Sequence, residues 1–127
     1  MYKLGSSERA DLPLAVVIGA GTMGMAVARR LAQRHRVLLA DIDAPKLRDV
    51  EARLTESGAE VATMICNTTA EPEVNALAEY ALEQFGAAHV MFNNAGIGGF
   101  GDPWTDPIEL WHRVVDVNLF GVVHGIR

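Results

Sequence analysis

Short runs of apolar residues alternate along this chain with longer segments in which apolar side chains recur at helical spacing. The short runs predict buried strands, and they cover residues 14–18, 36–40, 59–65 and 88–92. The longer segments predict helices over residues 22–34, 44–57 and 71–85, and another helical pattern begins at about residue 108. Strands that alternate with helices in this way predict a parallel sheet built from βαβ units.

Right-handed crossovers place four such strands in the order 3-2-1-4. The expected fold class is therefore α/β, the first half of a Rossmann-type doubly wound sheet. It covers residues 13–127, behind a flexible lead-in at residues 1–12. The inward face predicted for the helix over residues 71–85 comprises Val74, Leu77, Ala78, Ala81 and Leu82. Ligands of such sheets bind where the first and fourth strands meet, so the residues just after each strand are the candidate site.

The first strand is followed by Gly19-Ala20-Gly21-Thr22-Met23-Gly24, a G-x-G-x-x-G pattern between a predicted strand and a predicted helix. In that setting Gly19 allows a tight turn, Gly21 lets a pyrophosphate approach the backbone, and Gly24 permits close packing of helix on sheet. The helix that begins at Thr22 and Met23 offers free N–H groups and the positive end of its dipole to phosphates. The pattern predicts a dinucleotide site, and the alternative is a plain strand-to-helix turn.

Asp41 follows the second strand at about 20 residues from the glycine turn, the spacing expected for a carboxylate that binds adenosine ribose. Such a carboxylate accepts hydrogen bonds from both ribose hydroxyls and repels a 2′-phosphate. No basic residue follows until Lys46, so NAD is favoured over NADP as the cofactor. The alternative role of Asp41, capping the next helix, fits Asp43 better.

Asn67 follows the third strand, where its amide side chain is placed to hydrogen-bond an adenine edge. A turn or a cap before the helix that begins at Glu71 is nearly as good an interpretation of Asn67. The neighbouring Cys66 has no basic residue nearby to lower its pKa, so we expect a small core residue there.

The fourth strand is followed by two amides and two small residues, Asn93, Asn94, Ala95 and Gly96. The small residues suit close approach of the backbone to a ribose, and the amides suit hydrogen bonds that tie neighbouring strands together. We therefore assign Asn93, Ala95 and Gly96 to the predicted cofactor site. A simple turn is the alternative.

Composition and charge exclude several other classes of protein. Asp and Glu outnumber Lys and Arg by 16 to 11, and a net charge of −5 argues against nucleic-acid binding. The uncharged stretch at residues 12–28 has acidic residues before it and glycines inside it, which disfavours a signal peptide or a membrane span. One cysteine and four histidines at irregular spacing match no disulfide framework or metal site and favour a cytoplasmic protein.

Residues 19–24, Asp41, the run at residues 93–96 and the segment Asn118-Leu119-Phe120-Gly121 together resemble the short-chain dehydrogenase/reductase family. The resemblance extends from about residue 14 to residue 127. It implies NAD(P)-dependent hydride transfer between an alcohol and a carbonyl compound of small size. It also implies that Asn118 is a catalytic residue that helps to hold a proton relay, with a polar break in an apolar helix as the alternative. In the family the helix that begins here is a common dimer contact, so the resemblance implies a homo-oligomer.

The sequence departs from the family pattern at two places. The family's T-G-x-x-x-G-x-G pattern is met by Ile18 in place of threonine, and by Met23 and Met25 in place of glycines, which puts the geometry of the phosphate loop in question. Asn67 stands where an aspartate commonly contacts adenine in the family, and an amide can still donate and accept there.

The family's catalytic serine and Tyr-x-x-x-Lys have no counterpart in these 127 residues, because Tyr2 and Tyr80 lack a lysine four positions on. We therefore expect the cofactor-binding half of an oxidoreductase, inactive alone, whose uncharged residues 117–126 are covered by oligomerisation or by a longer chain. One alternative is a non-catalytic module that senses NAD or supports a partner. Another is a methyltransferase, which the apolar Val16-Val17-Ile18 disfavours because an acidic residue normally precedes the glycines of that family.

Overall fold

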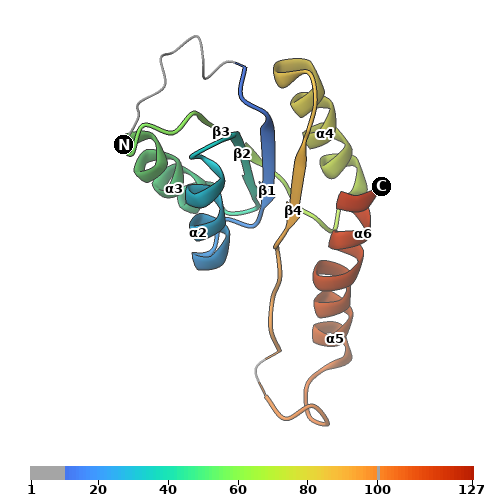
Figure 1. Ribbon diagram of the computed structural model, residues 1–127. Coiled ribbons are helices and arrows are strands. Elements are labelled where there is room, and N and C mark those ends of the chain that lie inside the picture. Colours follow the sequence, from blue (N-terminus) through green and yellow to red (C-terminus); the bar gives the residue numbers. More distant parts are fainter. Residues whose placement is uncertain (1–10, 100) are drawn as a thin grey trace.

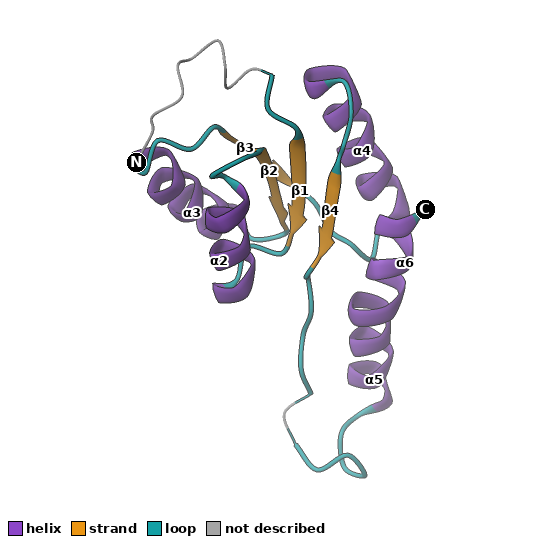
Figure 2. Cartoon of the chain, in the orientation of Figure 1, coloured by secondary structure: helices purple, strands orange, loops and turns teal. Residues whose placement is uncertain are grey.

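A four-stranded sheet with helices on both faces forms the body of the protein (Figure 1, Figure 2). The computed structural model describes residues 11–99 and 101–127, so the predicted lead-in lies almost wholly outside the described residues. The strands are β1 (Leu14–Ile18), β2 (Arg36–Asp41), β3 (Val61–Ile65) and β4 (Val90–Asn93). Every neighbouring pair is parallel and the order is β3-β2-β1-β4, which confirms the predicted α/β doubly wound topology.

The helices divide between the two faces of the sheet. They are α2 (Thr22–Leu31), α3 (Ala44–Glu56), α4 (Glu71–Phe85), α5 (Ile108–Val115) and α6 (Gly121–Ile126), and a π-helical turn η1 (Asp116–Phe120) joins the last two. Figure 1 shows α2 and α3 on one side of the sheet, with α4, α5 and α6 on the other. The first and fourth strands are adjacent, so the switch point predicted from the crossover rules lies between β1 and β4.

The two central strands are buried on both faces and supply both hydrophobic cores. One core joins alternate β1 and β2 side chains to α4, through Leu14, Val16, Ile18, Leu38, Val74, Leu77 and Ala81. The other joins the intervening side chains to α2 and α3, through Val17, Val37, Leu39, Ala28, Leu47, Val50 and Leu54. Burial on both faces explains why these strands are continuous apolar runs rather than alternating ones.

The boundaries differ from the predicted ones where local packing ends an element early. Helix α2 ends at Leu31 because the chain turns there, with Arg34 N–H donating to the Leu31 carbonyl at 2.9 Å. The third and fourth strands begin two residues later than predicted, at Val61 and Val90. The helical pattern from residue 108 is interrupted by the π-helical turn, which the hydrophobic spacing did not indicate.

The predicted inward face of α4 is partly wrong. Val74, Leu77 and Ala81 are buried, but Ala78 is exposed and Leu82 is 56% exposed. Val74, Leu77 and Ala81 pack in the core with β1 and β2, whereas Ala78 and Leu82 do not belong to that core. The helical spacing correctly identified the apolar residues of α4 but overestimated the width of the face that the sheet covers.

Arg36 joins three segments at the amino ends of the strands, opposite the carboxyl ends. Its Nε donates to the Leu12 carbonyl at 3.0 Å, and its NH2 group donates to the Phe85 carbonyl at 3.3 Å. The guanidinium also lies over the Phe85 ring, 5.0 Å from its centroid. One side chain of β2 therefore ties the end of α4 to the segment before β1 at this end of the sheet.

The cores predict a large difference between two identical substitutions. Leu38→Ala removes a fully buried side chain from a central strand, and we expect it to lower the free energy of unfolding by about 2–5 kcal/mol. Leu82→Ala, on the exposed side of α4, should change it by no more than about 0.5 kcal/mol. Urea denaturation followed by circular dichroism measures both. Equal losses in the two variants would contradict the assignment of the core.

Candidate functional site

A cavity of about 670 Å³ lies at the carboxyl ends of β1, β2 and β4. Its walls are the turn after β1, the segments that follow the other strands, and one face of α5. The structure brings most of the predicted site residues together in this lining, namely Gly19, Gly21, Thr22, Met23, Asp41, Asn67, Ala95 and Gly96. Gly24, Asn93 and Asn118 are not among the described residues that line it.

Two glycines of the turn are required by protein packing, and one is not. Gly19 has φ +102°, and a Cβ there would lie 2.8 Å from the backbone nitrogen of Ala95. A Cβ at Gly24 would collide with the carbonyl oxygen of Gly19, so α2 packs directly on the turn. A Cβ at Gly21 would meet no protein atom within 4 Å, although Gly21 lines the cavity. The missing side chain of Gly21 therefore leaves room on the cavity side of the turn.

The N-terminus of α2 opens on the cavity without a side-chain cap. Gly21 is its N-cap residue and provides no side-chain hydrogen bond, and the first turn holds no acidic residue. Thr22 and Met23 line the cavity at the start of the helix, where backbone N–H groups have no intrahelical partner. The positive end of the helix dipole is thus available to an anionic group.

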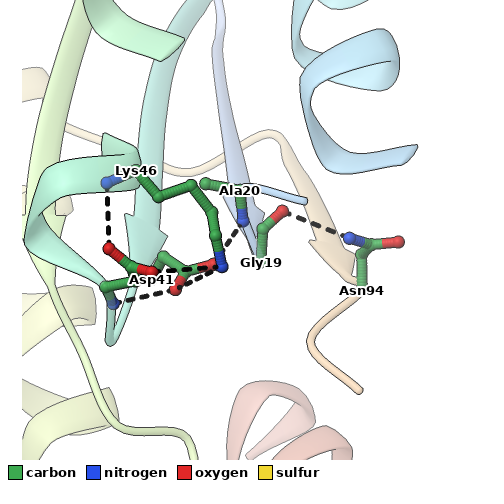
Figure 3. Close-up of polar contacts among 6 residues, drawn as sticks. Gly19, Ala20, Asp41, Lys46 and Asn94 are labelled. Carbon is green, nitrogen blue, oxygen red and sulfur yellow. Dashed lines mark hydrogen bonds and ion pairs between the residues drawn. The ribbon is translucent and has the colours of Figure 1, made fainter. Parts of the chain in front are cut away.

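Asp41 is bound on both of its carboxylate oxygens (Figure 3). Oδ2 accepts a hydrogen bond from the backbone N–H of Ala20 at 2.6 Å, and Oδ1 accepts one from the N–H of Asp43 at 2.9 Å. The side chain is only 10% exposed, yet it lines the cavity. Each oxygen keeps acceptor capacity for a ligand hydroxyl. The bonds fix the carboxylate beside the glycine turn in one orientation.

Lys46 lies beside Asp41, which the sequence analysis did not anticipate. Its Nζ is 3.7 Å from Oδ1 of Asp41 and 3.7 Å from Oδ2 of Asp43, and the residue lines the cavity. Asp43 caps α3 by accepting from the Lys46 N–H at 2.9 Å, as predicted for an N-cap residue. The cap places Lys46 in the first turn of α3, and this position is the signal that could have located its ammonium near the site.

The segment after β3 combines a turn with a buried thiol. The Oδ1 atom of Asn67 accepts from the N–H and the hydroxyl of Thr69, at 3.1 and 2.9 Å, so this amide oxygen stabilises a turn. Cys66 is 2% exposed and belongs to the core, as expected. Burial and, secondarily, the charge of Glu73 raise the pKa of the Cys66 thiol to about 11. The thiol therefore stays protonated at neutral pH and is a poor nucleophile.

Asn94 ties β4 to the glycine turn. Its N–H donates to the Ile18 carbonyl at 3.0 Å, and its Nδ2 donates to the Gly19 carbonyl at 3.2 Å (Figure 3). The hydrogen bond from Asn94 Nδ2 to the Gly19 carbonyl holds Ala95 against Gly19 at the cavity wall. Asn93 faces the other way, because its side chain lies against Gly125 of α6, and its buried Oδ1 has no hydrogen-bond partner among the described residues.

Asn118 connects the π-helical turn to the loop after β4. Its Nδ2 donates to the Ile97 carbonyl and its Oδ1 accepts from the Ile97 N–H, both at 2.8 Å. A Cβ on Gly96 would lie 3.3 Å from that oxygen, so the loop passes closely over the amide. π-Helical turns inside helices are frequent at functional sites. Here the turn holds the loop at the cavity rim in a fixed position.

Helix α5 and the turn η1 provide a wall of the cavity that was not predicted from the sequence. Leu110, Arg113 and Val117 line it, at the i, i+3, i+7 spacing of one helical face. That spacing was the available signal, but the hydrophobic stripe of Trp111, Val114 and Val115 dominated the pattern. Trp111 and Val115 are exposed on another face of the same helix, and Arg113 adds a second cation to the cavity lining.

The described ranges contain neither a membrane-spanning helix nor a metal-binding cluster. No helix within residues 11–99 or 101–127 combines the length and apolar character that a membrane crossing requires. In the same ranges, no cluster of three or more His, Cys, Asp or Glu side chains is placed to bind a metal ion.

Comparison with known proteins gives consistent matches along almost all of the chain. A family model for short chain dehydrogenases matches residues 13–127. Cyclohexanol dehydrogenase of Acinetobacter sp. (strain SE19) is 34% identical over 124 residues, which are 95% of this chain and 49% of that protein. The chain spans about half the length of this and other curated relatives that it matches.

The solved structures that resemble this chain include a complex with NAD and a complex with NADPH. A short chain dehydrogenase/reductase from Burkholderia phymatum in complex with NAD has a TM-score of 0.87 and 39% identity, covering 94% of this chain and 43% of that one. The F189W actinorhodin polyketide ketoreductase with NADPH has a TM-score of 0.88 and 34% identity, covering 92% and 46%. The sheet and its flanking helices therefore occur in proteins bound to NAD and in proteins bound to NADPH.

The glycine turn predicts different outcomes for two glycine-to-alanine substitutions. Gly24→Ala forces a methyl group against the Gly19 carbonyl, and we expect a loss of about 1–3 kcal/mol in the free energy of unfolding. Gly21→Ala has open space and a φ of −68°, which alanine adopts freely, but alanine is a poorer N-cap residue than glycine. Because these two effects oppose each other, Gly21→Ala should change the free energy of unfolding by no more than about 0.5 kcal/mol. Thermal and urea unfolding of both variants test this difference. A loss in Gly21→Ala as large as that in Gly24→Ala would contradict the open geometry at Gly21.

Proposed function

The chain belongs to the short-chain dehydrogenase family, and on this premise we propose that it forms the nucleotide-binding half of an oxidoreductase. The proposed reaction transfers a hydride between a nicotinamide dinucleotide and the alcohol or carbonyl carbon of a small molecule. The observation that carries the proposal is the open cavity at the switch point, where an uncapped helix N-terminus and an oriented carboxylate lie side by side. A dinucleotide has the two matching groups, a pyrophosphate and a ribose diol.

The pyrophosphate is assigned to the start of α2. The backbone N–H groups of Thr22 and Met23 and the dipole of the helix would bind its oxygens, and Gly21 leaves the space that it needs. Gly19 and Gly24 act indirectly, since they let the turn and the helix pack at the required distance. Met23 is 66% exposed at this edge, so its side chain is free to cover the bound phosphates.

The adenosine is assigned to the ends of β2 and β3. Asp41 would accept hydrogen bonds from the two ribose hydroxyls, because both of its oxygens retain acceptor capacity. A carboxylate in that position disfavours a 2′-phosphate, so we propose NAD as the preferred cofactor. Asn67 would contact the adenine through its Nδ2, since its Oδ1 already serves the turn to Thr69.

The nicotinamide half is assigned to the loop after β4. Ala95 and Gly96 line the cavity, and these small residues would let the second ribose approach the backbone closely. The proposed contact of Asn93 with the cofactor stays a prediction, because its side chain faces α6 in this structure. Asn118 would act on the reaction by holding the rim of the cavity and a proton relay beyond it, as the family resemblance implies.

Hydride transfer also needs an acid–base group, and this sequence assigns none. Gln84 stands four residues after Tyr80, where the family's tyrosine would be followed by lysine. When bound, the dinucleotide supplies the hydride acceptor or donor. We propose that these 127 residues bind and orient the cofactor without turning substrate over, which equally fits a non-catalytic NAD-binding module. A cytoplasmic location stays a prediction.

A homo-oligomer remains part of the proposal. The last helical segments expose a row of large apolar side chains, comprising Ile108, Trp111, Val115, Leu119, Phe120 and Ile126. Exposed apolar surface of this kind is typical of an interface. A second copy of the chain is the partner that the family resemblance implies.

Fluorescence titration with NADH tests the proposed function. We expect saturable binding to the wild-type chain, and Gly21→Ala should weaken it by about tenfold, or about 1.4 kcal/mol, because the methyl group occupies the space of the pyrophosphate. Leu82→Ala, whose side chain is on the exposed side of α4, is the control and should bind as the wild type does. Binding of neither NADH nor NADPH to the folded wild-type chain would refute the proposed function.

A further inference from the structure

Lys46 places a positive charge where the carboxylate of Asp41 is expected to exclude a 2′-phosphate. Its ammonium is 3.7 Å from Asp41 and is 43% exposed, whereas Asp41 is only 10% exposed. Lys46 is therefore the more solvent-accessible charge of the pair, and both residues line the cavity. A phosphate bound at this part of the cavity would lie near the ammonium as well as the carboxylate.

Two hydrogen bonds to the backbone hold the carboxylate in place. The N–H groups of Ala20 and Asp43 each donate to one of its oxygens. Among the described residues, the ammonium has two ion pairs at 3.7 Å, with Asp41 and Asp43, and these are longer than direct hydrogen bonds. Lys46 can therefore swing toward a ligand phosphate while Asp41 stays in place. Its flexible stem and rotatable donors suit this task.

Resting on the proposed function, we propose that Lys46 sets how strongly this site discriminates NAD from NADP. With Asp41 and Asp43 as its neighbours, the ammonium reduces the local charge at the ribose site from two negative charges to one. Asp41 then favours the ribose hydroxyls, while Lys46 offers an ion pair to a 2′-phosphate. The site therefore prefers NAD only moderately, and the preference depends on the balance of two adjacent side chains.

A purely structural role for Lys46 is the competing explanation. As an ion pair at the start of α3, Lys46 would contribute little to stability and nothing to ligand choice. The two explanations differ in one measurable quantity, the ratio of the dissociation constants for NADPH and NADH. A structural role leaves that ratio unchanged when the lysine is removed.

The test compares Lys46→Gln with Arg48→Gln in fluorescence titrations with NADH and NADPH. Arg48 is exposed on the same helix and is not among the described residues lining the cavity, so its loss makes the same change in net charge away from the site. We expect Lys46→Gln to raise the NADPH-to-NADH ratio by about fivefold to tenfold, and NADH affinity to change by less than about twofold. Arg48→Gln should leave the ratio unchanged. The effect of Lys46→Gln should shrink at high salt.

A second pair of variants removes the carboxylate charge while keeping its shape. Asp41→Asn can still accept from the Ala20 N–H, and it leaves Lys46 without its buried partner. We expect Asp41→Asn to bind NADPH more tightly than NADH. The double variant Asp41→Asn with Lys46→Gln should lose this preference for NADPH. Competition by adenosine 2′,5′-bisphosphate and by 5′-AMP is measured on the same variants. Because both compounds lack the nicotinamide half, their affinities report on the adenosine site alone.

The outcomes separate the two proposals. An unchanged ratio in Lys46→Gln, or an equal shift in Arg48→Gln, would overturn the role of Lys46 while leaving cofactor binding intact. A wild-type chain that is folded but binds neither dinucleotide nor either adenosine phosphate would overturn the proposed function, and the role of Lys46 with it.

Discussion

The hydrogen-bonded junction around the Gly19–Ala20 turn is the constraint on which the rest of the site depends. Asp41 at the end of β2 accepts from the Ala20 N–H, and Asn94 after β4 donates to the Gly19 carbonyl. Gly24 in α2 packs against the same carbonyl with no room for a side chain. One turn thus fixes the start of a helix and the ends of the two strands that flank β1. The cavity exists because these ends are held together while the outer side of the turn, at Gly21, is left uncovered.

Much of this arrangement follows from the sequence because it depends on local patterns and on the handedness of chain connections. Apolar runs located all four strands, and the crossover rule gave their order. Residues that depend on tertiary packing were missed. The proximity of Lys46 to Asp41 arises from the capping of α3 by Asp43, and the π-helical turn at Asp116–Phe120 leaves no periodic signal. Likewise, Leu82 belongs to an apolar stripe of α4 but lies outside the core that α4 forms with β1 and β2.

The two ends of the parallel sheet differ in the side chains that they present. At one end of the sheet, Arg36 donates to the Leu12 carbonyl before β1 and to the Phe85 carbonyl at the end of α4. At the other, the backbone donors of α2 and the paired charges of Asp41 and Lys46 remain accessible to a ligand. The proposed cofactor site thus lies within the described residues, while the family's Tyr-x-x-x-Lys has no counterpart in this sequence. The chain spans about half the length of the relatives that it matches.

The measurement that tests the central claim most directly is backbone amide NMR of the chain during titration with NAD. The account predicts that the largest shifts occur at the amides of Gly21, Thr22 and Met23, where the pyrophosphate is assigned. The amide chemical shift of Arg36, at the opposite end of the sheet, should not change. Shift changes centred on Arg36, or no shift change at the α2 N-terminus under saturating NAD, would contradict the claim that this turn is a dinucleotide site.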